Sequence, residues 1–117
     1  MSFSYNIKKD NDFLIVNFIG NLLSKEQALG LIEELENEFS NGYENVIINL
    51  SQMQYLNSTG LNIFIRILTL VRNNGGDVMI ANVPEKINKL LVVTKLNSVF
   101  NIVKTIEKAK EELIKSK

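Results

Sequence analysis

Residues 46–83 read VIINLSQMQYLNSTGLNIFIRILTLVRNNGGDVMIANV, and this stretch sets the architecture of the chain. It opens with a short, mostly β-branched run over residues 46–50, of the kind found in buried parallel strands. An apolar helix over residues 61–72 follows, and Asn73-Asn74-Gly75-Gly76 ends it. A second apolar strand covers residues 77–83. Strand, helix and strand in this order predict a right-handed βαβ unit whose two strands are parallel.

The residues before this unit predict a β-hairpin and a first helix. Apolar and polar side chains alternate over residues 3–7, as in a half-buried strand, and residues 9–12 form a turn. Residues 13–19 are apolar at nearly every position and predict a second strand. Ser24 is expected to cap the first helix in a capping box, with Gln27 reaching back to the cap. The inner face of this helix carries Ala28, Leu31, Ile32, Leu35 and Phe39.

The residues after the unit predict two more helices with a short apolar stretch between them. Pro84 suits the first turn of a third helix, and residues 99–102 form the apolar stretch. A last helix is expected from about Thr105. Residues 51–56 are interpreted as the connection from the third strand to the second helix. Together these elements predict an α/β fold, in which an N-terminal hairpin and a parallel βαβ core form a mixed sheet covered by about four helices.

The length and the charge of the chain restrict its class. A chain of 117 residues is the size of one compact domain, so we expect residues 1–117 to form a single domain. Thirteen Lys and Arg residues balance thirteen Asp and Glu residues. With no net charge, the bulk electrostatics do not draw the chain to nucleic acid or to an anionic membrane. A nucleic-acid partner is therefore not expected.

The amino-acid types that are missing exclude most catalytic chemistry. The sequence has no Cys and no His, which removes thiolate nucleophiles, imidazole bases and the common zinc sites. None of its six glycines falls in the spacing of a phosphate-binding loop. No acidic cluster for a magnesium ion is expected at a strand end. We therefore predict that the chain is not an enzyme and has no cofactor or metal site.

The sequence contains no segment that predicts export or insertion into a membrane. Residues 1–10 lack the basic start and the apolar stretch of a signal peptide. The longest apolar stretch, residues 63–71, contains Arg66 and is far shorter than the about 20 residues that span a bilayer. A cytoplasmic protein without a membrane span is expected.

One polar segment stands out at the start of the second helix. Asn57-Ser58-Thr59-Gly60 places two hydroxyls where a helix presents unpaired amides and the positive end of its dipole. The segment also follows the carboxyl end of a parallel strand, where open α/β sheets place their binding sites. Because Asn and Ser are preferred capping residues, local chemistry alone is compatible with a helix cap or with a functional site.

Residues 46–51 (VIINLS) and 55–61 (YLNSTGL), followed by Gly75-Gly76 and an apolar strand, resemble the STAS domain of anti-sigma factor antagonists. The resemblance extends over essentially the whole chain. In that family the strand typically ends D-L-S and the helix opens D-S-S-G or D-S-T-G. A partner kinase, which is also the anti-sigma factor, phosphorylates the second hydroxyl. By position the resemblance implies phosphorylation at Thr59, with Ser58 as the runner-up because Ser58 is better placed to cap the helix.

The resemblance also implies a switch in partner binding. The unphosphorylated domain would bind the kinase, a histidine-kinase-like ATPase, through Asn57, Ser58, Thr59 and Gly60, and would thereby free a sigma factor. Phosphorylation would release the kinase. The alternative is a STAS domain that docks constitutively on a transporter ATPase or a signalling complex and is not phosphorylated. An enzyme or nucleotide-binding domain is a third hypothesis, which the missing residue types disfavour.

Three positions depart from the pattern of the family. Asn49 and Asn57 stand where the family often has Asp, and Leu23 stands where many members carry another acid. The two hydroxyls, in contrast, are retained. The departures therefore remove negative charge from the region that a kinase would contact.

Overall fold

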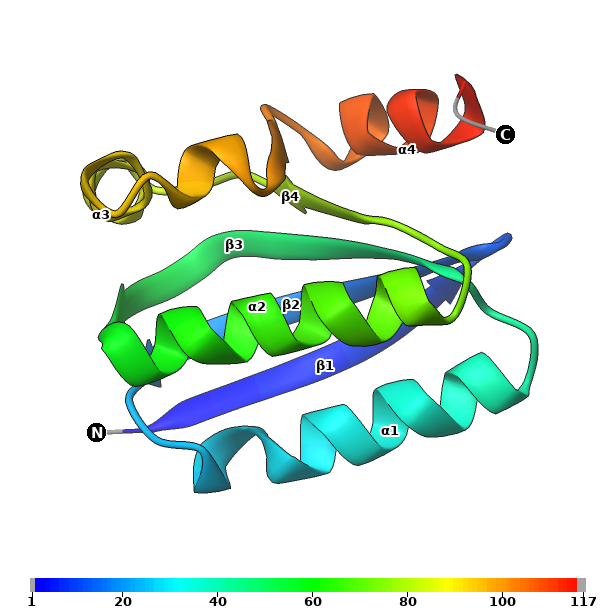
Figure 1. Cartoon of the computed structure of the whole chain (residues 1–117), viewed down its shortest axis with the longest axis horizontal. Helices are drawn as coiled ribbons and strands as arrows, with labels where there is room; N and C mark the ends of the chain where they lie inside the picture. Colours follow the sequence, from blue (N-terminus) through cyan, green and yellow to red (C-terminus); the bar gives the residue numbers. More distant parts are fainter. Residues whose placement is uncertain (1, 116–117) are drawn as a thin grey trace.

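The computed structural model describes residues 2–115, and it confirms a mixed α/β fold (Figure 1). The strands form one sheet in the order β1-β2-β3-β4-β5. They are β1 (Phe3–Asp10), β2 (Phe13–Leu22), β3 (Asn45–Leu56), β4 (Val78–Ala81) and β5 (Asn101–Val103). The α-helices are α1 (Leu29–Ser40), α2 (Ser58–Asn73), α3 (Glu85–Val93) and α4 (Ile106–Lys115). Two 3-10 turns, η1 (Glu26–Ala28) and η2 (Leu96–Ser98), precede α1 and β5.

Strand pairing follows the predicted hairpin and βαβ unit. β1 pairs with β2 antiparallel, and Asn11 in the turn between them has a φ of +54°, a left-handed conformation that asparagine tolerates. β2, β3, β4 and β5 are parallel to one another along the sheet. Each parallel connection contains a helix, because a parallel strand can be reached only by a crossover.

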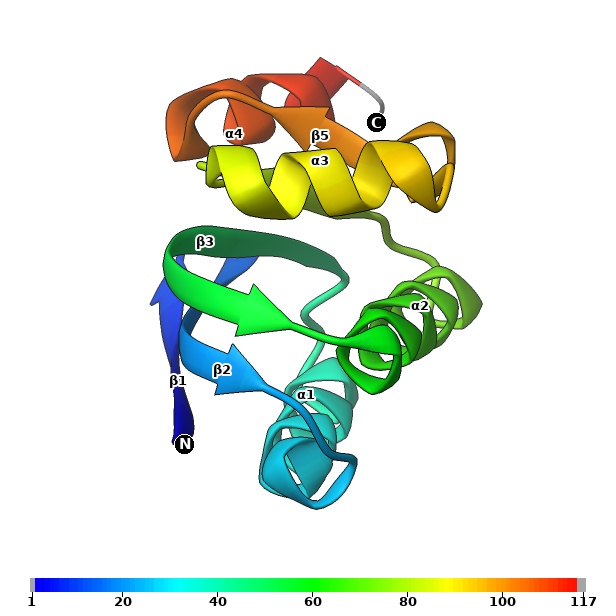
Figure 2. The ribbon, with the colours of Figure 1, turned by 90° about the vertical axis from the view of Figure 1, so that its left-hand side faces the viewer.

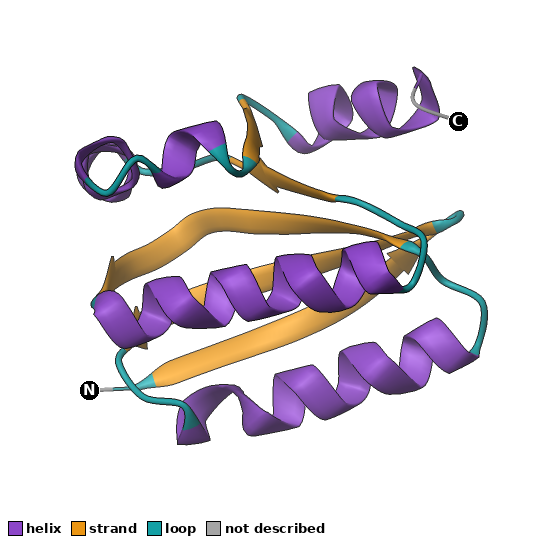
Figure 3. Cartoon of the chain, in the orientation of Figure 1, coloured by secondary structure: helices purple, strands orange, loops and turns teal. Residues whose placement is uncertain are grey.

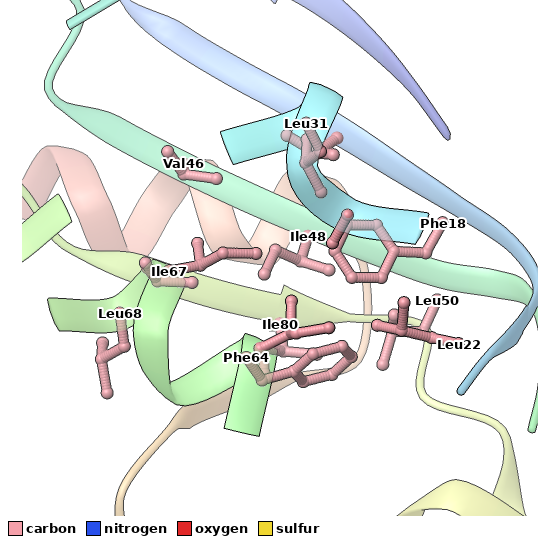
Figure 4. Close-up of a cluster of buried hydrophobic side chains, with 14 of the residues drawn as sticks. Phe18, Leu22, Leu31, Val46, Ile48, Leu50, Phe64, Ile67, Leu68 and Ile80 are labelled. Atoms are coloured by element: carbon pink, nitrogen blue, oxygen red, sulfur yellow. The ribbon is translucent and has the colours of Figure 1, made fainter. Parts of the chain in front are cut away.

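The two faces of the sheet carry separate hydrophobic clusters, because side chains alternate along each strand. The larger cluster joins the sheet to α1, α2 and α3, and includes Phe18, Ile48 and Phe64 (Figure 4). The smaller cluster joins the other face to α4, and includes Ile47 and Leu113. Figure 2 shows α1 and α2 together on one side of the sheet. This arrangement places the start of α2 beside the start of α1.

A chain of phenylalanine rings links four parts of the larger cluster. The ring centroids of Phe3 and Phe18 lie 5.4 Å apart, those of Phe18 and Phe64 lie 5.3 Å apart, and those of Phe64 and Phe100 lie 6.2 Å apart. Edge-to-face contacts of this kind are favourable at these distances. Phe18 and Phe64 are fully buried, which contributes about 1.5–3 kcal/mol for each side chain. These contacts hold α2 firmly against β2.

β3 is longer than the sequence pattern predicts. Residues 51–56, interpreted above as a connection, continue the strand to Leu56 and pair with the end of β2. The pairing shifts register at two places, and such irregularities bend a strand and re-aim its side chains. Met53 and Leu56 are therefore buried, whereas Tyr55 faces solvent. Polar residues between the buried ones interrupt the apolar pattern, which hides the strand in the sequence.

The start of the first helix differs from the predicted capping box. α1 begins at Leu29 after η1, and no side-chain hydrogen bond caps either start, so the prediction that Ser24 caps the helix is wrong. Gln27 does reach back as expected, because its Oε1 accepts from the N–H groups of Leu23 at 2.7 Å and Ser24 at 3.1 Å. Within the predicted inner face, Phe39 is only partly buried and the other four residues are buried.

Candidate functional site

The predicted polar segment, residues 57–60, lies where β3 meets α2. β3 ends at Leu56 and α2 begins at Ser58, so Asn57 is the residue that precedes the helix. Figure 3 shows this connection at the same end of the sheet as the connection from β2 to η1. The backbone N–H of Asn57 donates to the Leu22 carbonyl at 3.4 Å, which joins the two connections.

Asn57, rather than Ser58, caps α2. Its Oδ1 accepts a hydrogen bond from the Gly60 N–H at 3.0 Å, and its Nδ2 donates to the Leu23 carbonyl at 3.1 Å. A carboxylate could make the first of these hydrogen bonds but not the second, because it has no N–H to donate. The side-chain amide of Asn57 therefore joins the start of α2 to the first residue after β2.

The hydroxyls of Ser58 and Thr59 make no hydrogen bond to residues 2–115. Ser58 is exposed, and Thr59 is partly buried. The expectation that Ser58 serves as the helix cap is wrong, because the side chain of Asn57 accepts the hydrogen bond from the Gly60 N–H. Neither hydroxyl is needed to hold the helix in place, so both are available for another role.

Gly60 packs the first turn of α2 against the end of β2. It is buried, and a Cβ atom added to it would lie 2.6 Å from the Leu22 carbonyl oxygen and 2.9 Å from the Leu56 Cβ. Contacts this short force the backbone apart, so only glycine allows the approach. The approach sets the position of the two hydroxyl residues immediately before it.

A groove of about 360 Å³ between α1 and α2 opens beside Thr59. Its wall on the α1 side is formed by Lys25, Ala28, Leu29 and Ile32, and its wall on the α2 side by Thr59, Asn62, Ile63 and Arg66. The lining thus contains two cations and no carboxylate. Lys25 and Arg66 are site residues that the sequence patterns above do not single out. The spacing of residues 59, 62, 63 and 66, which share one helix face, is a signal that could have found Arg66.

Asn49, another departure from the family pattern, also makes structural hydrogen bonds. Asn49 lies in β3, on the face to which α4 packs. Its Nδ2 donates to Asn17 Oδ1 at 2.6 Å, and its Oδ1 accepts from Asn82 Nδ2 at 3.0 Å. Leu23 donates its backbone N–H to the Gln27 side chain. Neutral side-chain hydrogen bonds therefore occupy positions 49 and 57, and an apolar side chain occupies position 23.

A larger hollow of about 760 Å³ lies at the carboxyl ends of β4 and β5, and its lining includes Lys104, Thr105 and Lys108. Lys108 pairs with Glu111 at 3.6 Å and with Glu112 at 3.5 Å. The Thr105 hydroxyl caps α4 by accepting from the Lys108 N–H at 3.1 Å. Because the hydroxyl and one of the two cations of this hollow are already engaged, the groove beside Thr59 is the better candidate.

The chemistry of the candidate site is that of hydroxyls, amides and cations. Among residues 2–115 no three His, Cys, Asp or Glu side chains gather where they could hold a metal ion. Over the same residues no helix has both the length and the apolarity to cross a membrane. The groups whose pKa departs clearly from its ordinary value, Tyr5, Asp10 and Glu38, do not line the groove. The arrangement is suited to binding a partner or an anion.

Known sequences are similar to this chain over nearly its full length. A family model described as the STAS domain matches residues 4–109. A protein of Thermotoga maritima, provisionally named an anti-sigma factor antagonist, is 30% identical over 112 residues, which cover 95% of this chain and 96% of the relative. The anti-sigma-B factor antagonist of Bacillus subtilis is 26% identical over 102 residues, which cover 87% of this chain and 92% of the relative.

Solved structures share the same fold. A crystal structure of a Thermotoga maritima protein with that provisional name has a TM-score of 0.82 at 25% identity, and the similarity covers 93% of each chain. The anti-sigma factor antagonist SpoIIAA in its unphosphorylated form has a TM-score of 0.71 at 10% identity, covering 96% of this chain and 98% of that chain. The Bacillus cell fate determinant SpoIIAA in its phosphorylated form has a TM-score of 0.70 at 13% identity, covering 93% of this chain and 98% of that chain. The similarity to the last two structures concerns the fold alone.

Proposed function

The chain belongs to the STAS domain family of anti-sigma factor antagonists, and we propose that it binds an anti-sigma factor and thereby frees a sigma factor for transcription. In this proposal residues 1–117 act as one STAS domain in the cytoplasm. The partner is an anti-sigma factor that is also a serine/threonine kinase of the histidine-kinase-like ATPase type. The docking surface contains Asn57, Ser58, Thr59 and Gly60, and the chain itself catalyses no reaction.

The proposed phosphorylation site is Thr59. The observation that carries this proposal is that Asn57 caps α2. The hydroxyl of Thr59 therefore makes no hydrogen bond that holds the helix, within the part of the chain described. A hydroxyl that only capped the helix would be bound to a backbone amide. Ser58 also lacks such a bond and remains the runner-up. Thr59 is preferred because it matches the second hydroxyl of the family motif.

Phosphorylation would release the partner through charge. In the transfer, the γ-phosphoryl group of ATP bound to the kinase moves to Thr59 Oγ1, ADP leaves, and the hydroxyl proton passes to a base on the kinase. The product carries about −1.5 to −2 charge at pH 7. The N-terminus of α2 tolerates this charge, because its dipole and free amides favour anions. Docking would instead remove the phosphate from water against a partner surface, which is unfavourable without compensating charge.

The second candidate function is constitutive docking on a transporter ATPase or a signalling complex. The observation that favours it is the replacement of family acids by Asn49 and Asn57, whose side-chain hydrogen bonds are structural, and by the apolar Leu23. A docking subunit needs the shape of the α2 N-terminus but not a phosphate acceptor. The two functions are distinguished by whether Thr59 is modified.

The experiment is a pull-down from native lysate with the wild-type chain and Thr59→Ala as baits. We expect both baits to retain one ATPase of the kinase type. On addition of ATP and Mg²⁺, the wild type should gain one phosphate at Thr59 and lose the partner, whereas Thr59→Ala should stay bound. Mass spectrometry of bait and prey identifies both. Ser58→Ala is the matched control and should behave as the wild type.

Two outcomes would contradict the proposal. Phosphate found only at a residue other than Thr59 would show that Thr59 is not the phosphorylation site. A partner that binds both baits and remains bound with ATP, without any phosphate on the chain, would favour the constitutive docking function.

A further inference from the structure

The groove between α1 and α2 brings two cationic side chains to the residue proposed for phosphorylation. Lys25 lies on the α1 side, just before η1, and Arg66 lies on the α2 side together with Thr59. Neither cationic group forms an ion pair or a side-chain hydrogen bond with any residue from 2 to 115. Among residues 2–115, no carboxylate is paired with either of these two cations.

The geometry of α2 directs Arg66 toward Thr59. Arg66 follows Thr59 by seven residues, so the two lie on the same face, about 10 Å apart along the helix axis. Long side chains of a helix lean toward its N-terminus, which is the direction of Thr59. Lys25 approaches the groove from the opposite wall. A group attached to Thr59 therefore lies at a groove that has one cation on each wall.

The space between these cations is apolar and contains no acid. Ala28, Ile32 and Ile63 are buried and line the groove. Glu26 and Glu33 lie next to lining residues in the chain but do not line the groove themselves. The two cations themselves are exposed at the rim of these apolar walls. No carboxylate of the groove competes for the two cations.

We propose that Lys25 and Arg66 form an intramolecular receptor for a phosphate on Thr59, so that the phosphate lies within the groove. This inference rests on the proposed phosphorylation of Thr59. The guanidinium of Arg66 presents a planar set of donors that fits two phosphate oxygens, and the ammonium of Lys25 supplies a second positive charge. The bound phosphate occupies the mouth of the groove, and it thereby excludes a partner side chain that would enter there.

The test uses the full chain with phosphothreonine encoded genetically at position 59, so that no kinase is needed. The readout is the pKa of the second ionisation of the phosphate, followed by ³¹P NMR titration. Free phosphothreonine has a value of about 6. We expect a lower value in the otherwise unchanged chain, and a rise of roughly half a unit or more when Lys25→Ala and Arg66→Ala are combined. The helix dipole acts equally in both proteins, so the difference reports the two cations.

Three controls sharpen the measurement. Arg66→Lys keeps the charge but loses the planar donor set, and should give an intermediate pKa. Lys89→Ala removes an exposed cation on α3 and should give no change. Phosphoserine encoded at position 58, outside the groove lining, should have a pKa that the double substitution does not alter. The effect at position 59 should also shrink as the salt concentration rises.

Equal phosphate pKa values in the unchanged chain and in the double variant would overturn the receptor. Thermal melting of each variant shows whether the fold is kept, and both substituted side chains are exposed. The outcome is separate from the proposed function, because the phosphate is installed without a kinase. A kinase that modifies Thr59 while the titration shows no effect would retain the function and reject the receptor. If the titration shows the effect but no kinase that modifies Thr59 is found, the receptor is retained and the proposed function is rejected.

Discussion

Asn49 of β3 donates a hydrogen bond from its side-chain Nδ2 to Asn17 Oδ1 of β2 at 2.6 Å. Asn17 in turn donates to Asn6 Oδ1 at 2.7 Å, and Asn82 donates to Asn49 Oδ1 at 3.0 Å. The four amides form a ladder across the sheet, and each of its three hydrogen bonds is donated toward β1. Each member both donates and accepts inside the ladder except at its two ends. The ladder satisfies polar side chains on the face of the sheet to which α4 packs.

We predict that Asn49→Asp lowers the free energy of unfolding by about 1 kcal/mol at neutral pH. A carboxylate still accepts from Asn82 and from the Ser51 N–H, but it cannot donate to Asn17. Urea unfolding of the variant and the wild type measures the difference. Asn6→Asp is the matched control, because Asn6 only accepts in the ladder and should change little. Equal losses in the two variants would contradict the ladder.

The cap of α2 predicts a graded series at position 57. Asn57→Ala should cost about 1 kcal/mol, because the Gly60 N–H and the Leu23 carbonyl both lose their partner. Asn57→Asp should cost less, because a carboxylate keeps the cap and interacts favourably with the helix dipole. Denaturant titration of the variants gives the order. Ser58→Ala should lie within about 0.5 kcal/mol of the wild type, and a larger loss would mean that Ser58 takes part in the cap.

Two helical glycines should respond to alanine in opposite directions. Gly60→Ala should destabilise the protein by roughly 1–3 kcal/mol, because its Cβ would meet the Leu22 carbonyl oxygen at 2.6 Å. Gly30→Ala in α1 should be neutral or stabilising by up to about 1 kcal/mol, because its Cβ would meet only the Tyr5 hydroxyl at 3.0 Å and alanine favours the helix. Thermal melting of both variants tests the contrast. Similar melting temperatures for the two variants would contradict the close approach of Gly60 to the Leu22 carbonyl.

The stability of the hairpin should depend on pH through Asp10. The Lys110 side chain of α4 donates a hydrogen bond to Asp10, and this bond, with the attraction of the charge, holds the pKa of Asp10 below its usual range. A lowered pKa in the folded state means that the stabilisation is complete above the unfolded value of about 3.9 and is lost as the pH falls through the folded value. The advantage of the wild type over Asp10→Asn should therefore disappear in acid.

Melting temperatures of the wild type and Asp10→Asn between about pH 2 and pH 6 measure this dependence. Lys110→Met is the matched variant and should show the same flattened profile. The pKa of Glu38 is also lowered, mainly by the Asn41 side chain and then by Lys9, so part of the acid sensitivity should remain in both variants. Parallel profiles for the wild type and Asp10→Asn would show that the ion pair does not contribute.

Thr59→Glu should abolish binding to the proposed kinase while leaving the melting temperature nearly unchanged. The Thr59 hydroxyl has no hydrogen bond to lose within residues 2–115, and a negative group in the first turn of α2 is favourable by about 0.3–1 kcal/mol. Docking would bury the same charge, which can weaken binding by several kcal/mol. Calorimetric titration of the kinase with Thr59→Glu and Thr59→Ala gives the comparison. Tight binding of the Glu variant would exclude release by charge.

Elements with a strong local pattern could be predicted from the sequence. The βαβ unit over residues 46–83 was predictable because its apolar runs and the Gly75-Gly76 stop are local signals. The hairpin was predictable because residues 3–7 alternate and the polar residues 9–12 indicate a turn, although Lys9 and Asp10 still belong to β1 and only residues 11–12 turn. The position of the segment 57–60 follows from the same local reasoning, because a strand must end and a helix must begin around it.

Features that depend on pairing between distant residues could not be predicted in this way. The extension of β3 to Leu56 arises from bulged pairing with β2. The polar residues Ser51, Gln52 and Gln54 interrupt the apolar pattern there and do not indicate a strand. The choice of Asn57 as the cap depends on Leu23, whose carbonyl takes the second hydrogen bond of the amide.

By itself the sequence determined the order of the elements, the mixed sheet with its parallel core, and the position of the two hydroxyls in the chain. It could do so because short-range periodicity and helix-stop residues act within a few positions. The tertiary structure alone decided that Lys25 and Arg66 share one groove with Thr59, and that four asparagines join into one ladder. Lys25 and Arg66 stand on different elements that meet only because their apolar faces pack on the same side of the sheet. Contacts of this kind between distant segments follow from burial of the whole core, and no local sequence pattern predicts them.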